Sequence, residues 1–317
     1  MARSDRLTIA PDATALPRNS AMTGVLLIVC ATFFFACMDA TTKHLTAIYS
    51  VPMVVAVRYI GNLLVMLLFF APRHGRQLFV TRRTGLVLVR AACLAAASLF
   101  AGLALQRMPV AETVAIIFLA PLTVVLLARP VLGEVIGLTG WLAAIGGFLG
   151  VLLIVRPGSG LDTWGVVLAV LCATVTVAYY LLSRVLARTE STMAMLFYTT
   201  LAGTLVFSAM LPWSWGGPAP TALDAVLLGG MGVLAAAGHW CFTGAYRHAP
   251  ASLLAPVNYL HLVWAGLLGW LVFAHVPDLL TIIGMAIVTA AGIATALRTH
   301  FAERADRGVS PAPEPAP

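Results

Sequence analysis

The feature that most constrains this chain is a succession of long apolar runs separated by short charged or polar stretches. A helix needs about 20 apolar residues to cross the hydrocarbon core of a membrane. Such runs predict helices near residues 21–43, 50–71, 85–106, 110–130, 135–155, 163–183, 192–212, 223–246, 250–273 and 279–298. Because 61% of the 317 residues are hydrophobic and only 10% are charged, too few polar side chains remain for a water-soluble surface. We therefore expect an all-α polytopic membrane protein of about ten transmembrane helices.

The Lys and Arg residues predict the orientation of the chain, because cytoplasmic loops carry an excess of positive charge. With a cytoplasmic N-terminus and alternating spans, only Lys43, Arg107 and Arg156 fall on the outside. The residues on the cytoplasmic side are Arg3, Arg6, Arg18, Arg73, Arg76, Arg82, Arg83, Arg129, Arg184, Arg188, Arg247, Arg298, Arg304 and Arg307. This asymmetry predicts that both termini face the cytoplasm. The net charge of +7 does not indicate nucleic-acid binding, because the basic residues lie singly or in small groups between apolar segments.

The chain contains a weak internal repeat. A shift of 141 residues places Ala104 on Ala245, Pro109 on Pro250 and Leu119 on Leu260. Each unit would hold five helices, and because five is odd the second unit must enter the membrane upside down relative to the first. We therefore expect two inverted five-helix repeats. The predicted boundaries are a cytoplasmic tail over 1–20, repeats over 21–157 and 163–298, and a disordered cytoplasmic tail over 299–317.

Short motifs mark both halves of the chain. In the first half they are Leu105 with Pro109, Leu119-Ala120-Pro121, Leu132-Gly133-Glu134, and Gly146, Gly147 and Gly150. In the second half they are Ala255-Pro256-Val257-Asn258-Tyr259, Leu267-Leu268-Gly269-Trp270, Val276-Pro277-Asp278, and Gly284 with Gly292. With these motifs the chain resembles the drug/metabolite transporter superfamily, specifically its bacterial members with two tandem EamA-type repeats. The resemblance implies a ten-helix secondary carrier for small organic metabolites, with both termini inside.

One position departs from that family. Its members commonly have a Glu at the end of the fourth helix of each half, which here is Glu134 in the first half and His275 in the second. We expect this Glu mainly to cap the following helix, because a carboxylate near an N-terminus is favoured by the helix dipole. A changed pH response is the alternative consequence of His275.

We therefore expect a transporter in the bacterial inner (plasma) membrane that moves a small organic metabolite by alternating access, either coupled to protons or as an exchanger. The alternatives are a polytopic membrane enzyme and a membrane-embedded sensor or structural protein. No paired acidic motif, clustered metal ligands or P-loop supports an enzyme, a metal or a cofactor. The expected partners are a small-molecule substrate and membrane lipid, and a homodimer is compatible with the sequence. A planar or zwitterionic substrate such as a flavin or S-adenosylmethionine is favoured, with its identity and direction left open.

Ionisable side chains inside the apolar runs are candidate transport residues, because charge is costly in lipid. Arg58, with Asn62 one turn later on the same face, could hold a substrate carboxylate or pair with a carboxylate of the bundle. Arg90 lies near the cytoplasmic end of its span, so we expect it to snorkel to the headgroups.

Two carboxylates are candidates for coupling or gating. Asp39 and Lys43 lie four residues apart, so we expect an ion pair on one helix face, with a gating role as the alternative. Glu112 is expected to cap the fourth helix, with proton acceptance as the alternative. In a proton-coupled carrier Asp39 and Glu112 are the first candidates, because a coupling group must change charge.

Polar and aromatic side chains of the later spans complete the predicted substrate site. In the ninth span Asn258 and His261 share a face, with Trp264 beside them. We add Tyr180 of the sixth span and His239 and Trp240 of the eighth. Such a mixture could enclose a planar or amphipathic solute. The alternatives are that the aromatic rings fill helix interfaces and that the histidines are interhelical hydrogen-bond donors.

Proline and glycine positions predict breaks and seams. Pro121 and Pro256 lie in equivalent helices, and each frees a backbone carbonyl four residues earlier, which points to a binding site between matching broken helices. Gly146 and Gly150 form a GxxxG motif, and Ala286 and Ala290 repeat its spacing. We expect these small residues to line packing seams.

Overall fold

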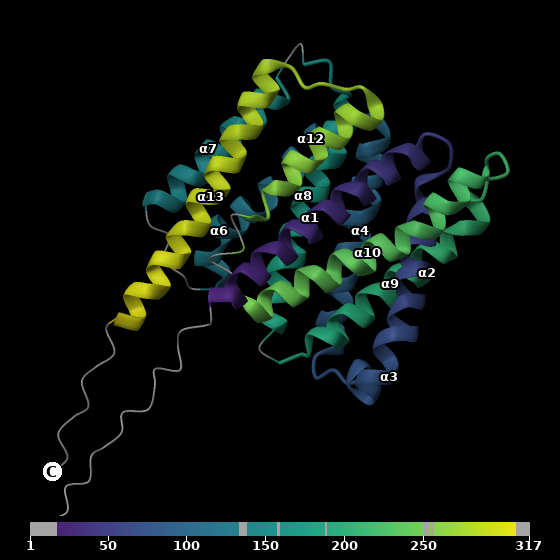
Figure 1. Cartoon of the computed structure of the whole chain (residues 1–317), viewed down its shortest axis with the longest axis horizontal. Coiled ribbons are helices and arrows are strands. Elements are labelled where there is room, and N and C mark those ends of the chain that lie inside the picture. Colours follow the sequence, from purple (N-terminus) through teal and green to yellow (C-terminus); the bar gives the residue numbers. More distant parts are fainter. Residues whose placement is uncertain are drawn as a thin grey trace, which may run out of the picture.

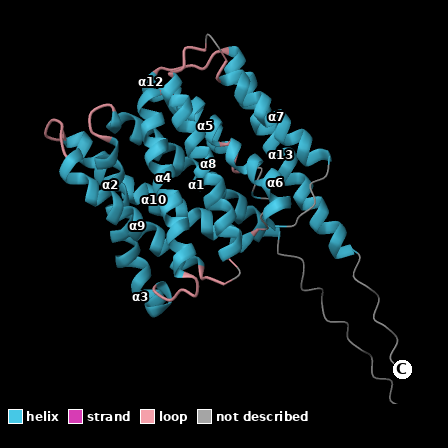
Figure 2. Ribbon diagram, turned by 180° about the vertical axis from the view of Figure 1, so that it is seen from behind, coloured by secondary structure: helices cyan, strands magenta, loops and turns pink. Residues whose placement is uncertain are grey.

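Apolar runs in lipid fold as helices, because only a helix satisfies its own backbone N–H and C=O groups. A computed structural model describes residues 18–132, 138–156, 159–187, 189–249, 254 and 257–308, and every regular element in these ranges is helical (Figures 1 and 2). The elements are α1 (Arg18–Thr46), α2 (Val51–Val65), η1 (Met66–Phe70), α3 (Ala71–His74), η2 (Gly75–Leu78), α4 (Thr84–Arg107), α5 (Val110–Ile117), α6 (Leu119–Leu132), α7 (Leu138–Ile154), α8 (Thr163–Leu186), α9 (Thr192–Ser214), α10 (Ala222–His248), α12 (Leu260–Phe273) and α13 (Leu279–Gly308).

The helices match the predicted spans. Within the described part of the chain, six segments are long and apolar enough to cross a membrane: Met22–Thr46, Val51–Arg73, Thr84–Arg107, Thr163–Leu186, Thr192–Ser214 and Ala222–Ala245. Shorter apolar helices cover the other predicted spans: Val110–Val124, Trp141–Ile154, Leu260–Phe273 and Leu279–Ala294. The expected all-α polytopic fold is therefore confirmed. The ends differ from the prediction, because α1 already begins at Arg18 and α13 continues to Gly308; the remainder of both predicted tails lies outside the described residues.

The two halves interlock instead of packing as separate bundles. The most extensive helix contacts join α1 to α10, α4 to α8 and α7 to α13, and each pair takes one helix from either half. The first three spans are α1, α2 and α4 in the first half and α8, α9 and α10 in the second. The contact between the first span of one half and the third span of the other occurs twice, as α1–α10 and as α8–α4. The contact between the second span of one half and the third span of the other also occurs twice, as α2–α10 and as α9–α4. Figure 1 shows α7 beside α13 along one flank of the molecule. This exchange relation is what two inverted repeats of five helices produce.

The seam between α7 and α13 depends on glycine. A Cβ added to Gly150 would lie 2.8 Å from the carbonyl oxygen of Gly284, and one added to Gly284 would lie 2.6 Å from that of Gly150. The two backbones therefore touch, as in small-residue contacts of other membrane helices. This confirms Gly150 as a seam residue.

The partner residues of that seam differ from the prediction. Gly146 faces open space, and the other glycine on the packed face is Gly147, which lies against Leu122. Ala286 and Ala290 are exposed, so the predicted seam along them is wrong. The spacing of small residues was compatible with several faces of each helix, and the choice among them depends on where the neighbouring helix lies.

Both halves contain a broken helix at the same place in the repeat. In the first half α5 ends at Ile117 and α6 begins at Leu119, so the interruption at Phe118 precedes Pro121, whose missing N–H cannot bond the Ile117 carbonyl. In the second half α12 begins at Leu260 after a turn at residues 258–259. The shift of 141 residues maps Phe118 onto Tyr259, and the two rings pack together with centroids 5.0 Å apart.

Tyr259 fits there because α13 presents Gly292 to it, where a side chain would overlap the phenol ring. Pro256, the predicted cause of the second break, lies outside the described residues, as does Glu134. The roles of Pro121 and Pro256 in transport stay predictions.

Candidate functional site

Asp39 of α1 and His261 of α12 meet between the two halves. Their Oδ2 and Nε2 atoms lie 3.0 Å apart, and both side chains are largely buried. The backbone N–H of His261 donates to the Asn258 carbonyl, which fixes the main chain of His261 in the turn before α12. The contact therefore joins a predicted coupling residue to a predicted substrate residue.

The predicted ion pair between Asp39 and Lys43 is wrong. The Lys43 ammonium instead donates to the carbonyl oxygens of Leu105, at 3.0 Å, and Met108, at 2.7 Å. These carbonyls lie at the C-terminal end of α4, where helical acceptors have no partner and the helix dipole attracts a cation. Lys43 therefore caps α4, and Asp39 remains for His261.

Aromatic rings surround this contact. The ring of Phe35 lies edge-on to His239 at a centroid distance of 5.2 Å and 6.4 Å from the His261 ring. Phe118, at the break between α5 and α6, packs edge-on to His261 at 5.8 Å. We did not predict either phenylalanine. The sequence does indicate both positions. Phe35 precedes Asp39 by one helical turn and so lies on the same helix face, and Phe118 is the repeat equivalent of Tyr259.

Arg58 completes what we call the central cluster, which consists of Phe35, Asp39, Arg58, His239 and His261. The contacts that the structure gives its guanidinium are the thioether sulfur of Met38, 3.9 Å from Nη1, and the face of the Tyr59 ring. Among the described residues no carboxylate pairs with it. Asn62 lies one turn further along α2 and is partly buried.

Three other predicted residues occupy distinct places. Trp264 is edge-on to Phe33 at 5.4 Å, and its buried indole N–H has no hydrogen-bond partner among the described residues. Tyr180 is 42% exposed and packs against Tyr179. Trp240 is 61% exposed on α10, so its ring faces away from the bundle and is not part of the central cluster.

A second contact between histidine and carboxylate lies toward the end of the bundle where α12 connects to α13. Glu112 Oε1 is 2.8 Å from His275 Nε2, and the Glu112 side chain is only 3% exposed. Its other oxygen, Oε2, has no hydrogen-bond partner among the described residues. The predicted helix cap by Glu112 is therefore wrong, because its carboxylate reaches across to the second half. His275, the position that departs from the family pattern, is its partner.

Arg90 does not snorkel. It is buried, and its guanidinium donates to Ser183 Oγ at 2.6 Å, Thr199 Oγ1 at 2.9 Å, Tyr179 Oη at 2.7 Å and the Met195 carbonyl at 3.2 Å. The snorkelling prediction failed because α8 and α9 supply oxygen acceptors at the depth of the side chain. All four acceptors are neutral, so the positive charge of Arg90 is solvated but not compensated.

Each ion pair between described side chains crosses the division between the halves. Besides the two contacts above, His44 meets Asp224 at 3.7 Å, Arg107 meets Asp162 at the start of α8 at 3.7 Å, and Arg156 meets Asp278. The hydrogen bond from the backbone N–H of Thr281 lowers the pKa of Asp278 below its ordinary value, and the hydrogen bond and positive charge of Arg156 lower it further. These last three pairs lie at the helix ends that carry the α1–α2, α7–α8 and α12–α13 connections. In this conformation the halves are bound together there.

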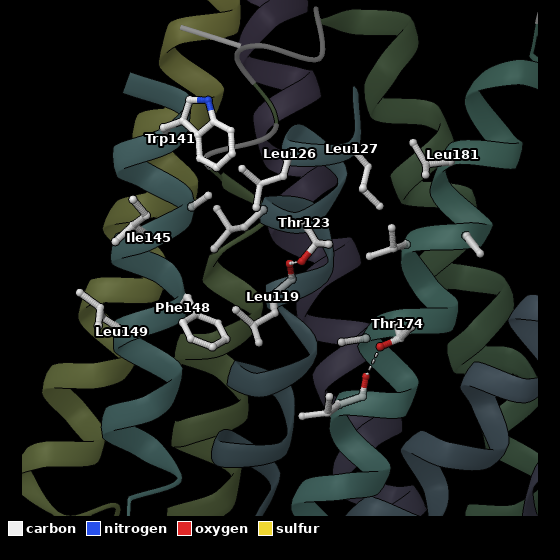
Figure 3. A pocket seen from close by; sticks show the side chains of 16 residues that line it. Leu119, Thr123, Leu126, Leu127, Trp141, Ile145, Phe148, Leu149, Thr174 and Leu181 are labelled. Carbon is white, nitrogen blue, oxygen red and sulfur yellow. Dashed lines mark hydrogen bonds between the residues drawn. The ribbon is translucent and has the colours of Figure 1, made fainter. Parts of the chain in front are cut away.

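An apolar groove of about 620 Å³ lies between α6, α7 and α8 (Figure 3). Trp141, Ile145 and Phe148 line it from α7, and all three are about half exposed. Its hydroxyl groups belong to Thr123 and Thr174, which donate to carbonyls of their own helices. The lining of the groove is therefore almost entirely apolar and carries no charged side chain, so the groove is not the candidate site.

Comparisons with known proteins agree with this architecture. The EamA-like transporter family matches residues 22–156 and 163–297. The chain is 31% identical to the pseudopaline exporter CntI of Pseudomonas aeruginosa, over 86% of this chain and 95% of that protein. It is 28% identical to a riboflavin transporter of Rhizobium johnstonii, over 88% and 92% of the two chains.

Two further similarities are more distant. The chain is 24% identical to an S-adenosylmethionine uptake transporter of Rickettsia felis, over 71% of this chain and 76% of that protein. A solved crystal structure shares the fold with a TM-score of 0.64 at 18% identity, and covers 90% of this chain and 100% of the other. The names of the relatives indicate transporters and not enzymes, which confirms the class expected from the sequence. The chain therefore belongs to the EamA-like transporter family, and it is a multi-pass membrane transporter of a small molecule.

Proposed function

We propose that the protein is a proton-coupled carrier of the inner membrane that works by alternating access, with its substrate at the central cluster. The observation that carries this proposal is the contact between Asp39 and His261. A coupling group must change charge when it changes access, and a carboxylate in contact with an imidazole provides two groups that can take up or release a proton. Asp39 and His261 belong to opposite halves. A change in their protonation therefore strengthens or weakens a hydrogen bond between the two halves.

Orientation is the second part of the proposal. The distribution of Lys and Arg supports cytoplasmic termini. The first residues of α1 and the last of α13 lie toward the same end of the bundle, at the lower left of Figure 1. The contact of Glu112 with His275 then lies on the outer side, and the conformation seen is closed to the outside. Lipid would cover the apolar side chains exposed around the bundle, including those of the groove.

Transport itself can be tested without knowing the substrate. Purified protein in liposomes loaded with an aqueous small-molecule extract of bacterial cytoplasm should release one or a few compounds, detected by mass spectrometry. We expect release to speed up when a pH gradient is imposed and to lose this dependence when a protonophore is added. Protein-free liposomes serve as the control. Absence of any protein-dependent release would reject the carrier, and release unaffected by the protonophore would reject proton coupling in favour of exchange.

The Glu112–His275 contact should keep the outer side closed. Hydrogen bonds to charged groups contribute about 1.5–3 kcal/mol, so Glu112→Gln should raise the population open to the outside by at least about tenfold. A cysteine at Ala111, which is 1% exposed, reports this opening through its reaction rate with a membrane-impermeant thiol reagent in a background without other cysteines.

Asp162→Asn is the matched control for Glu112→Gln. It makes the same chemical change in an exposed ion pair, whose contribution is about 0–1 kcal/mol. Asparagine also remains a good cap for α8, where the Asp162 carboxylate accepts the N–H of Gly165. Equal labelling rates in wild type, Glu112→Gln and Asp162→Asn would show that the Glu112–His275 contact does not close the outer side.

A further inference from the structure

We infer that the substrate carries a compact anionic group, a carboxylate or phosphate, that binds the Arg58 guanidinium in the central cluster. This inference rests on the proposed carrier function and specifies its substrate class. No relative named above assigns such a group to this chain.

The carboxylates within the described spans are already engaged. Asp39 is in contact with His261, and Glu112 with His275. Asp224, at the first turn of α10, accepts from Tyr49 and lies near His44. Among the described residues no carboxylate therefore forms an ion pair with Arg58.

Arg58 itself is poorly satisfied. A guanidinium has five N–H donors in a planar fork, and the partners that the structure gives Arg58 are the thioether of Met38, which is a weak acceptor, and the neutral side chain of Tyr59. Arg90 shows what a satisfied arginine in this bundle looks like, since four neutral oxygens accept its N–H groups. A partly buried guanidinium without such acceptors is costly in a low-dielectric interior, and a carboxylate or phosphate matches its fork geometry.

The surroundings of Arg58 favour an anion as well. Arg90 is a second cation of the bundle whose acceptors in the structure are all neutral, and no ion pair with a described carboxylate is found for it either. The Phe35 ring against His239 offers an apolar surface for the remainder of the substrate. Gly61 next to Asn62 touches the backbone of Gly232, which fixes this segment of α2 against α10.

The test compares Arg58→Gln and Arg58→Lys with wild type in the liposomes loaded with cytoplasmic extract. Every compound that the wild type releases should carry a carboxylate or phosphate. Arg58→Gln should slow its release by at least about tenfold, and Arg58→Lys should restore part of the rate, because lysine keeps the charge but not the fork. Arg82→Gln is the matched control, because it removes one exposed positive charge outside the spans and should release at the wild-type rate.

A second measurement separates recognition from misfolding. Methyl esters of a released carboxylate compound, or neutral triesters of a released phosphate compound, are added as competitors of its transport. In wild type they should inhibit transport at least about tenfold less well than the parent anion, and in Arg58→Gln ester and anion should inhibit equally well. Released compounds without an anionic group, or an unchanged rate and preference in Arg58→Gln, would overturn the inference while leaving the carrier intact. Release of nothing by the wild type would reject the carrier, and this inference with it.

Discussion

Asp39→Asn should yield a folded transporter that exchanges substrate across the membrane but no longer accumulates it against a pH gradient. Asparagine keeps the size and hydrogen-bonding capacity of Asp39 toward His261, 3.0 Å away, but it cannot take up or release a proton. Counterflow requires only the change of access, whereas accumulation requires the coupled proton. Loss of accumulation with retained counterflow is therefore the signature of a coupling residue, and both rates can be followed with the compound identified in the release experiment.

Two controls accompany this prediction. Asp278→Asn makes the same substitution in an ion pair at the end of the bundle and should accumulate substrate normally. His261→Asn should lose accumulation as Asp39→Asn does, because both members of the contact are needed. Normal accumulation by Asp39→Asn would remove the Asp39–His261 contact from the coupling mechanism, and simultaneous loss of accumulation and counterflow would indicate a structural role instead.

Gly150→Leu should have the largest effect on folding. Its first side-chain atom would lie 2.8 Å from the Gly284 carbonyl oxygen, and backbone cannot rotate aside as a side chain can. The seam between α7 and α13 would have to open, which we expect to lower the free energy of unfolding by about 3 kcal/mol, at the upper end of the range for overpacked interiors. Thermal unfolding in detergent, followed by the loss of the monodisperse peak in size-exclusion chromatography, measures the effect.

Gly146→Leu is a close control, since it adds the same side chain one turn earlier on the same helix. A Cβ at Gly146 meets no atom within 4 Å, so its unfolding temperature should stay near that of wild type. A conventional GxxxG seam would make the two substitutions equally damaging. Equal losses would therefore contradict the packing of α7 described above.

The spans and the family could be predicted because both depend on local composition. Each apolar run must form a helix in lipid wherever its neighbours lie, and the Pro and Gly motifs that mark the family are contiguous in the chain. The break before Pro121 followed for the same reason, since a missing N–H acts within its own helix.

The choice of partners could not be predicted in this way. The spacing of Asp39 and Lys43 favoured an ion pair, but tertiary packing placed His261 beside Asp39 and the end of α4 beside Lys43. Arg90 lies close enough to a helix end to snorkel, yet α8 and α9 brought it four acceptors.

By itself the sequence determined that the chain is a membrane bundle of two related units, because lipid imposes the helix on every apolar run and an odd number of helices inverts the second unit. Only the tertiary structure decided that the units interlock, so that Asp39 and Glu112 of the first half meet His261 and His275 of the second, while no described carboxylate forms an ion pair with Arg58. The physical reason is that a buried polar group bonds to whatever acceptor or donor packing brings within about 3 Å, and for Asp39, Lys43 and Arg90 that partner comes from a residue far apart in the chain.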